Sequence, residues 1–271
     1  MLWVVTQHKS DGSRRVTLSD SLAGLRSDTM ELQGVAALVT GGANRVGRAI
    51  VMALAEAGCD LVLHYNRSSD AAETTAAEVR ALGRQVRLAG ADLGDPSRAD
   101  EIIAGAGDLA PVRVLVNSAA VFREDSLGAV DTDVWNQTMA VNLRAPVFLT
   151  QALAKALPDG VVGSVVNVTD WRTARPYPDH FSYTVAKGGL DTFTIAGAAA
   201  LAPDIRVNGV ALGAILPPAG KDSAYLKDLA REIPLQRVGG TEPVAQAVLF
   251  LLRNHFITGE IIRLDGGAHL R

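Results

Sequence analysis

From Gly34 to the C-terminus, short aliphatic runs alternate with longer segments of helical spacing, and this alternation constrains the fold more than any other feature. Seven runs are candidate strands, at residues 35–40, 60–65, 86–91, 112–117, 164–169, 205–210 and 260–264. Most are continuously apolar, which is typical of strands buried on both faces of a parallel sheet. Ala- and Leu-rich segments such as 46–57, 71–82 and 134–156 separate them. The pattern predicts an α/β fold, a doubly wound seven-stranded parallel sheet of the Rossmann type.

The repeating pattern runs through residues 34–271 without a boundary, so we expect these residues to form a single domain. Residues 1–33 form an N-terminal extension that does not follow it. The runs at 2–6 and 14–18, on either side of a Ser-Asp-Gly-Ser turn, fit a hairpin. The extension could equally be loosely ordered or precede a natural start at Met30. We assign it no chemical role.

Composition excludes several classes of function. The net charge of -3 provides no basic field for nucleic acid and no basic helix for an anionic membrane surface. Cys59 is the only cysteine, so neither an intrachain disulfide nor a thiolate metal cluster can form. No apolar run is long enough to span a membrane, and the N-terminus does not resemble a signal peptide. His180 and His269 have no metal-ligand company, so we expect no metal. We expect a cytoplasmic protein that acts on a small molecule.

The first candidate strand leads into a glycine-rich turn and then a helix, at residues 40–50. In such a turn, backbone N–H groups and the helix N-terminus can approach a pyrophosphate. The middle glycine of the usual pattern is replaced by Arg45. From this turn we expect cofactor contacts by Gly41, Asn44, Arg45, Val46 and Gly47.

The second candidate strand ends where an NAD-selective site places an acidic residue for the ribose 2′-OH, and no acid is present there. The segment is instead His64, Tyr65, Asn66, Arg67 and Ser68. Arg67 and Ser68 offer a cation and a hydroxyl group that suit a 2′-phosphate, to which the arginine of the glycine-rich turn could add a second cation. The sequence therefore predicts NADP(H) as the cofactor. In the alternative, Arg67 is only a solvated loop residue.

The ends of later strands complete the predicted cofactor site. At the end of the third strand a carboxylate can meet the adenine amino group, and at the end of the fourth small residues let the backbone approach the cofactor. The further residues that we expect at the cofactor are Asp92, Leu93, Asn117, Ser118, Ala119, Gly213 and Ile215.

Tyr183 and Lys187 are four residues apart in a predicted helix and so lie on the same face, one turn from each other. A nearby ammonium stabilises tyrosinate, so we expect it to lower the pKa of the phenol toward the range of a working proton donor. The same lysine can hydrogen-bond to the nicotinamide ribose. The pair follows a strand that ends in a polar residue, Asp170, which favours a catalytic interpretation.

Taken together, these motifs resemble the short-chain dehydrogenase/reductase family over residues 34–271. The resemblance is carried by the Thr-Gly turn at 40–41, the Asn-Ser-Ala-Ala segment at 117–120, Asn142, Tyr183, Lys187 and the Asp-Gly-Gly segment at 265–267. It implies that Tyr183 is the proton donor, that Lys187 is its electrostatic partner, and that Asn142 holds a water linking Lys187 to solvent. It also implies direct hydride transfer from the nicotinamide to the substrate and a homo-oligomer, commonly a tetramer.

Asp170 departs from the family pattern, which has a serine thirteen residues before the tyrosine. An ionised carboxylate cannot donate to a carbonyl and would repel a developing alkoxide. It suits a substrate with N–H donors or an imine nitrogen. The aspartate, the turn arginine, the segment 64–68, His180 and the ending 265–271 resemble the pteridine reductase branch, in particular the bacterial dihydromonapterin and dihydrofolate reductases. In that branch an aromatic ring at the position of Phe122 stacks on the pterin.

Each of these substrate residues has a plainer interpretation. Phe122 could pack in the core, Asp170 could cap the following loop, and Trp171 could either line the substrate pocket or only cover it. The leading functional hypothesis is NADPH-dependent reduction of a C=N bond in a dihydropterin or dihydrofolate. The alternatives are a carbonyl reductase of 3-oxoacyl or sugar substrates and a non-catalytic nucleotide-sensing protein.

Overall fold

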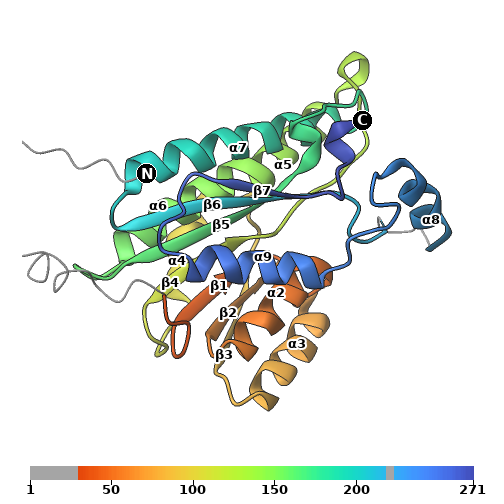
Figure 1. Ribbon diagram of the computed structural model, residues 1–271. Helices are drawn as coiled ribbons and strands as arrows, with labels where there is room; N and C mark the ends of the chain where they lie inside the picture. Colours follow the sequence, from red (N-terminus) through yellow and green to blue (C-terminus); the bar gives the residue numbers. More distant parts are fainter. Residues whose placement is uncertain (1–29, 218–222) are drawn as a thin grey trace, which may run out of the picture.

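A computed structural model describes residues 30–217 and 223–271 and contains one parallel sheet of seven strands (Figure 1). Their order is β3-β2-β1-β4-β5-β6-β7, so the direction of progression reverses between β1 and β4. The prediction of a doubly wound seven-stranded parallel sheet is confirmed. The strands are β1 Ala36–Val39, β2 Asp60–Tyr65, β3 Val86–Gly90, β4 Val112–Asn117, β5 Gly163–Asp170, β6 Ile205–Leu212 and β7 Ile261–Leu264.

Helices cover both faces of the sheet, with α2, α3 and α9 on one face and α4, α5, α6 and α7 on the other (Figure 1). The α-helices are α2 Arg45–Glu56, α3 Ser69–Ala81, α4 Ala99–Ala104, α5 Thr132–Met139, α6 Ala145–Ala156, α7 Phe181–Leu201, α8 Ser223–Glu232 and α9 Glu242–Arg253. Short 3₁₀ turns lie at η1 Pro96–Arg98, η2 Leu127–Ala129, η4 Trp171–Thr173 and η5 Ala268–Leu270.

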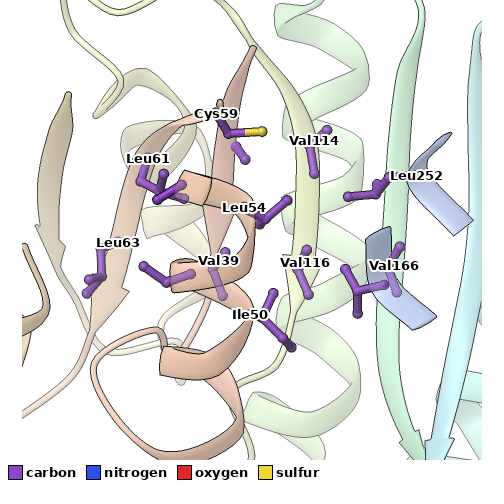
Figure 2. Packing of buried hydrophobic residues seen from close by; sticks show 14 of the residues in the cluster. Val39, Ile50, Leu54, Cys59, Leu61, Leu63, Val114, Val116, Val166 and Leu252 are labelled. Carbon is purple, nitrogen blue, oxygen red and sulfur yellow. The ribbon is translucent and has the colours of Figure 1, made fainter. Parts of the chain in front are cut away.

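The continuous aliphatic strands are buried on both faces, as the sequence pattern indicates. On the face covered by α2, Ile50 and Leu54 pack over Val39 and Val116 in the centre of the sheet (Figure 2). Full burial of a side chain of this size stabilises the fold by about 1.5–3 kcal/mol. Cys59 belongs to the same cluster, and burial raises the pKa of its thiol to about 12. The thiol is therefore a packing group.

The segment 134–156 differs from the single helix that its pattern predicts. Helices α5 and α6 are joined by a π-helical segment, η3 Ala140–Arg144, which contains Asn142. The side chain of Asn142 is fully buried, and its amide binds the backbone of Val121, in the loop after β4. Single π turns inside α-helices are frequent at functional sites. This one places the side chain of Asn142 against the loop that follows β4.

The hairpin predicted at 2–6 and 14–18 lies outside the described residues. Within the described part, Met30 and Leu32 already pack against the core. None of the helices in residues 30–217 and 223–271 has the length and apolar character that crossing a membrane requires. The same residues contain no group of three histidine, cysteine or acidic side chains placed to hold a metal ion.

Candidate active site

The glycine-rich turn between β1 and α2 is packed too tightly for side chains at two of its positions. A Cβ atom on Gly47 would lie 2.1 Å from the carbonyl oxygen of Gly41, and one on Gly41 would lie 3.0 Å from the Cα of Ala119. Gly41 also has a φ of +65°, which glycine adopts without strain. The turn thus brings bare backbone to the N-terminus of α2, where a cofactor phosphate fits.

His64 contributes to this turn from below. We expected its side chain among the cofactor contacts, but it is 1% exposed and lies beneath the turn. Its Nδ1 accepts a hydrogen bond from the backbone N–H of Gly41 (3.2 Å), which leaves Nε2 to donate to the carbonyl oxygen of Ala91 (3.1 Å). Burial lowers the pKa of His64, in keeping with this neutral imidazole. His64 therefore positions Gly41 and has no exposed surface for a cofactor.

The residues after β2 are open to solvent. Asn66, Arg67 and Ser68 are exposed and Tyr65 is half-buried. Within residues 30–217 and 223–271, no hydrogen bond or ion pair is found for the Arg67 guanidinium, so it is available to a phosphate. Arg45 is engaged elsewhere, because its Nη2 donates to the carbonyl oxygen of Pro217 (2.5 Å), in the loop after β6.

The turn residues Asn44 and Val46 flank the start of α2, with Asn44 exposed at the N-cap position. Asp92, after β3, is also exposed, and its Oδ1 accepts from the backbone N–H of Gly94 (2.8 Å). Leu93 turns its side chain into the core, which leaves only its backbone for a cofactor.

The end of β4 is held against the end of β1 by Thr40, which sequence reasoning missed. Its Oγ1 accepts hydrogen bonds from the backbone N–H groups of Ser118 (3.0 Å) and Ala119 (3.1 Å). Asn117 is buried, and its Nδ2 donates to Oδ1 of Asn167 on β5 (2.8 Å). In the sequence, Thr40 was visible as the first residue of the Thr-Gly turn, but that motif did not reveal these bonds. These bonds align the three strand ends that would face the cofactor.

Of the two predicted contacts after β6, Gly213 lies against the Asp-Gly-Gly segment. A Cβ atom on Gly213 would lie 2.5 Å from the Cα of Asp265, so this approach requires a glycine. Ile215 is 5% exposed and packs in the core.

The predicted catalytic residues meet where β5 ends and α7 begins. The hydroxyl group of Tyr183 donates to Oδ2 of Asp170 (2.8 Å). Lys187 lies one turn further along α7, and its Nζ donates to the carbonyl oxygen of Val168 (2.6 Å). Both α7 side chains are buried. The structure thus brings together the three side chains that the sequence singled out.

The acid–base balance of this group differs from our expectation. The pKa of Tyr183 lies well above its usual range, because burial and then the neighbouring charge of Asp170 oppose ionisation. The prediction that Lys187 lowers this pKa is wrong for the protein alone, since these two effects dominate. Burial also lowers the pKa of Lys187 to about 8 and raises that of Asp170. Tyr183 is therefore a protonated phenol, which is the form that a proton donor needs.

Asp170 combines two of the proposed roles. While Oδ2 accepts from Tyr183, Oδ1 accepts from the backbone N–H of Arg172 (2.9 Å) and so caps the η4 turn. The loop-capping interpretation is correct, but it occupies only one of the two carboxylate oxygens. The cap fixes the carboxylate, and the second oxygen is directed at the phenol.

Asn142 supports the substrate side of the site. Its Oδ1 accepts from the backbone N–H of Val121 (2.7 Å), and its Nδ2 donates to the carbonyl oxygen of the same residue (2.8 Å). The side-chain amide is thus occupied by the residue just before Phe122. The water relay through Asn142 stays a prediction.

Phe122 lies beside Tyr183 and is 44% exposed, so the core-packing interpretation is wrong. Its ring meets the Tyr183 ring edge-on, with centroids 4.7 Å apart and planes at 85°. The ring of His180 stacks on it at 3.9 Å and 14°. Trp171 is half-buried and packs against Tyr177, with ring centroids 5.6 Å apart. Trp171 therefore packs within the loop that follows β5.

An apolar hollow of about 640 Å³ lies on another side of the first turns of α7. Residues of the loop after β4, of the loop after β5 and of α7 line it, among them Leu127, Tyr177, Phe181 and Val185. Tyr183, Asp170 and Phe122 are not part of its lining, so it is separate from the catalytic group.

Comparisons with known proteins agree with this geometry. The family model described as Enoyl-(Acyl carrier protein) reductase matches residues 41–269. The chain is 34% identical to L-xylulose reductase of Bos taurus over 249 residues, 88% of this chain and 98% of that protein. It is 31% identical to 3-oxoacyl-[acyl-carrier-protein] reductase of Synechocystis over 236 residues, 85% and 95% of the two chains.

Two solved structures are similar over nearly their whole length. The FolM Alternative dihydrofolate reductase 1 from Brucella canis, complexed with NADP, is 38% identical with a TM-score of 0.83, covering 89% of this chain and 96% of that one. A short chain dehydrogenase from Burkholderia cenocepacia, in complex with NADP, is 32% identical with a TM-score of 0.82, covering 88% and 99%. With the sheet, the glycine-rich turn and the Tyr183–Lys187 pair in place, this chain belongs to the short-chain dehydrogenase/reductase family.

Proposed function

We propose that the protein is an NADPH-dependent reductase that adds hydride to a C=N bond of a dihydropterin or dihydrofolate. The observation that carries this proposal is the hydrogen bond from the Tyr183 hydroxyl to Asp170 (2.8 Å), beside the exposed ring of Phe122. An acceptor stands where a carbonyl reductase needs a donor, and a flat aromatic surface lies next to it. The similarity to a FolM dihydrofolate reductase at 38% identity supports the same substrate class.

The residues present fit NADP(H). The tight backbone of the glycine-rich turn would receive the pyrophosphate, and Arg67 with Ser68 would bind the 2′-phosphate through charge-assisted hydrogen bonds. Lys187, buried beside Tyr183, would hydrogen-bond to the nicotinamide ribose. When bound, NADPH supplies the hydride.

The chain itself supplies the proton that the substrate nitrogen takes up. Because Tyr183 stays protonated, its hydroxyl group can give its proton to a ring nitrogen as hydride reaches the adjacent carbon, which leaves a phenolate to be reprotonated. Asp170, whose pKa burial raises, can accept a hydrogen bond from an N–H edge of the substrate or hold the proton that replaces the one given by Tyr183. The substrate ring thereby gains one C–H bond from the hydride and one N–H bond from the proton, and one proton is consumed per turnover.

Carbonyl reduction is the second candidate, because the curated relatives include an L-xylulose reductase and a 3-oxoacyl reductase. The geometry at Asp170 disfavours it. While Asp170 is ionised it cannot donate to a substrate carbonyl, and its charge would raise the energy of the developing alkoxide.

Oxidation of NADPH, offered dihydrobiopterin, dihydrofolate, L-xylulose and an acetoacetyl thioester in parallel, separates the two candidates. We expect turnover of at least one dihydropterin or of dihydrofolate, and little turnover of the carbonyl compounds. The Asp170→Ser variant should lose most of that activity and gain weak carbonyl reduction. Asp159→Ser, on the exposed turn before β5, is the matched control and should behave as wild type. Brisk ketone reduction with no dihydropterin turnover, unaffected by Asp170→Ser, would overturn the proposal.

A further inference from the structure

His180, the residue just before α7, has a backbone conformation that residues other than glycine rarely adopt. Its φ is +51°, in the left-handed region, where an L-residue with a Cβ is strained. Such strain persists when surrounding contacts determine the conformation, and it is common at functional sites. The contacts of the His180 side chain therefore indicate which function this backbone conformation serves.

Two contacts fix the imidazole, which is 16% exposed. Its face stacks on the ring of Phe122, with centroids 3.9 Å apart and planes at 14°. Its Nδ1 lies 3.0 Å from Oδ2 of Asp179, and Oδ1 of that carboxylate accepts from Nη1 of Arg172 (2.8 Å). The ring is thus held both by stacking and by a carboxylate that is itself anchored.

Together with the bonds of Asp170, these contacts form a continuous ring of interactions that includes Tyr183. Arg172 donates its backbone N–H to Oδ1 of Asp170, and Oδ2 of Asp170 accepts from Tyr183. The Tyr183 ring in turn meets the ring of Phe122, on which His180 stacks. The same residues that define the proton donor therefore also determine where His180 lies.

The loop that carries Phe122 is anchored on both sides of that residue. Val121 is bound through its backbone to Asn142, and Asp125 accepts from the backbone N–H of Ser182 (3.1 Å), at the start of α7. The backbone on both sides of Phe122 is thereby anchored, whereas the residue remains 44% exposed. Among the described residues, His180 is the side chain stacked face to face on that ring, and the guanidinium of Arg172 also lies over it at the longer distance of 5.9 Å from the centroid.

We propose that His180 is a positioning residue: its imidazole covers one face of Phe122 and holds that ring against Tyr183, leaving the rest of the exposed ring for a flat substrate. At 3.9 Å no second ring fits between the two, so the substrate cannot use the covered face. The inference rests on the proposed function, in which Phe122 receives the substrate ring. It adds a specificity residue, because a Phe122 ring without support would tilt and bind flat substrates less tightly.

Two substitutions separate the ring of His180 from its backbone conformation. Asparagine tolerates the left-handed region, so His180→Asn preserves the start of α7 but removes the stacked ring. His180→Phe keeps a ring for stacking. For the dihydropterin that wild type reduces, His180→Asn should raise KM about tenfold with kcat within about twofold. His180→Phe keeps the stacked ring but loses the contact with Asp179 and fits the left-handed backbone less well, so it should raise KM by a smaller factor. NADPH affinity should be unchanged in both.

Two further measurements make the result decisive. The affinity of fully oxidised pterin for the NADP⁺-loaded protein, followed by pterin fluorescence, should fall about tenfold in His180→Asn and by a smaller factor in His180→Phe. In the ligand-free protein with ¹³C-labelled phenylalanine, the ring signal of Phe122, assigned with Phe122→Leu, should shift in His180→Asn and much less in His180→Phe.

Equal or tighter pterin binding by His180→Asn would overturn the inference, because His180 would then be neutral or would block the substrate face. An unchanged Phe122 signal would overturn it as well. Failure of wild type to bind or reduce any pterin would instead contradict the proposed function, and the Phe122 signal would still decide whether His180 positions that ring.

Discussion

The proposed cofactor region, at the ends of β1 and β2, and the proposed catalytic region, at the end of β5 and the start of α7, are held together by different kinds of contact. At the ends of β1 and β2, the shape comes from backbone packed against backbone, as at Gly41 and Gly47, with His64 holding the turn from below. At the end of β5 and the start of α7, the shape comes from side chains bonded to one another. A change in the first region should therefore affect binding, and a change in the second should affect turnover or substrate choice.

The largest effect should come from Tyr183→Phe. The variant retains the ring that contacts Phe122 but loses the proton donor, so kcat should fall about 10²–10⁴-fold while NADPH affinity persists. Steady-state kinetics and a cofactor titration measure the two quantities. Phe256→Leu, at an exposed residue between α9 and β7, is the control and should keep wild-type kcat. Near-normal turnover by Tyr183→Phe would show that Tyr183 is not the proton donor. It would also contradict the assignment of turnover to the second region.

A smaller effect is expected in the cofactor region from Arg67→Ala. Loss of one charge-assisted contact with the 2′-phosphate costs about 1.5–3 kcal/mol, which corresponds to roughly ten- to a hundredfold in NADPH affinity. NADH affinity and kcat at saturating NADPH should change little. Arg80→Ala, an exposed arginine on α3, is the matched control. If Arg67→Ala weakened NADPH and NADH equally, Arg67 would not be the residue that selects the phosphate.

The pH dependence of kcat tests the point where the two regions meet, at Lys187. Its pKa is lowered to about 8, so the ammonium is present below that pH and is lost as the pH rises through it. Because the pKa of Tyr183 is raised, the tyrosine keeps its proton over the same interval. We expect kcat to fall above pH 8, by at most about tenfold per pH unit. Lys187→Arg keeps its charge and should lack this fall. A wild-type profile that stays flat into the alkaline range would refute the assignment.

Sequence reasoning was most accurate where the signal is local. The strands were placed to within a few residues, because continuous aliphatic runs directly express burial on two faces. The break of 134–156 by a π turn was missed, since one such turn hardly alters the apolar spacing. The glycine-rich turn is contained in a few consecutive residues, so its motif could be recognised.

What the sequence could not provide was the outcome of competing three-dimensional effects. The direction of the Tyr183 pKa depends on how deeply the phenol is buried and on which oxygen of Asp170 faces it. His64 lies in a strand, and its position beneath the turn became clear only with the neighbouring Ala91 in place. His180 was noted as a likeness to relatives, but its stacking on Phe122 joins two loops far apart in the chain.

The burial of the one cysteine makes this protein convenient for site-specific labelling. Cys59 is fully buried with a thiol pKa of about 12, so maleimides should not modify it while the chain is folded. A cysteine introduced at Asp159, on the exposed turn before β5, would then be the only reactive thiol. In a parallel sheet this turn lies at the edge opposite the strand ends that carry the chemistry. A fluorophore or a surface linkage attached there would report on the enzyme, or immobilise it, without obstructing the entry of cofactor and substrate.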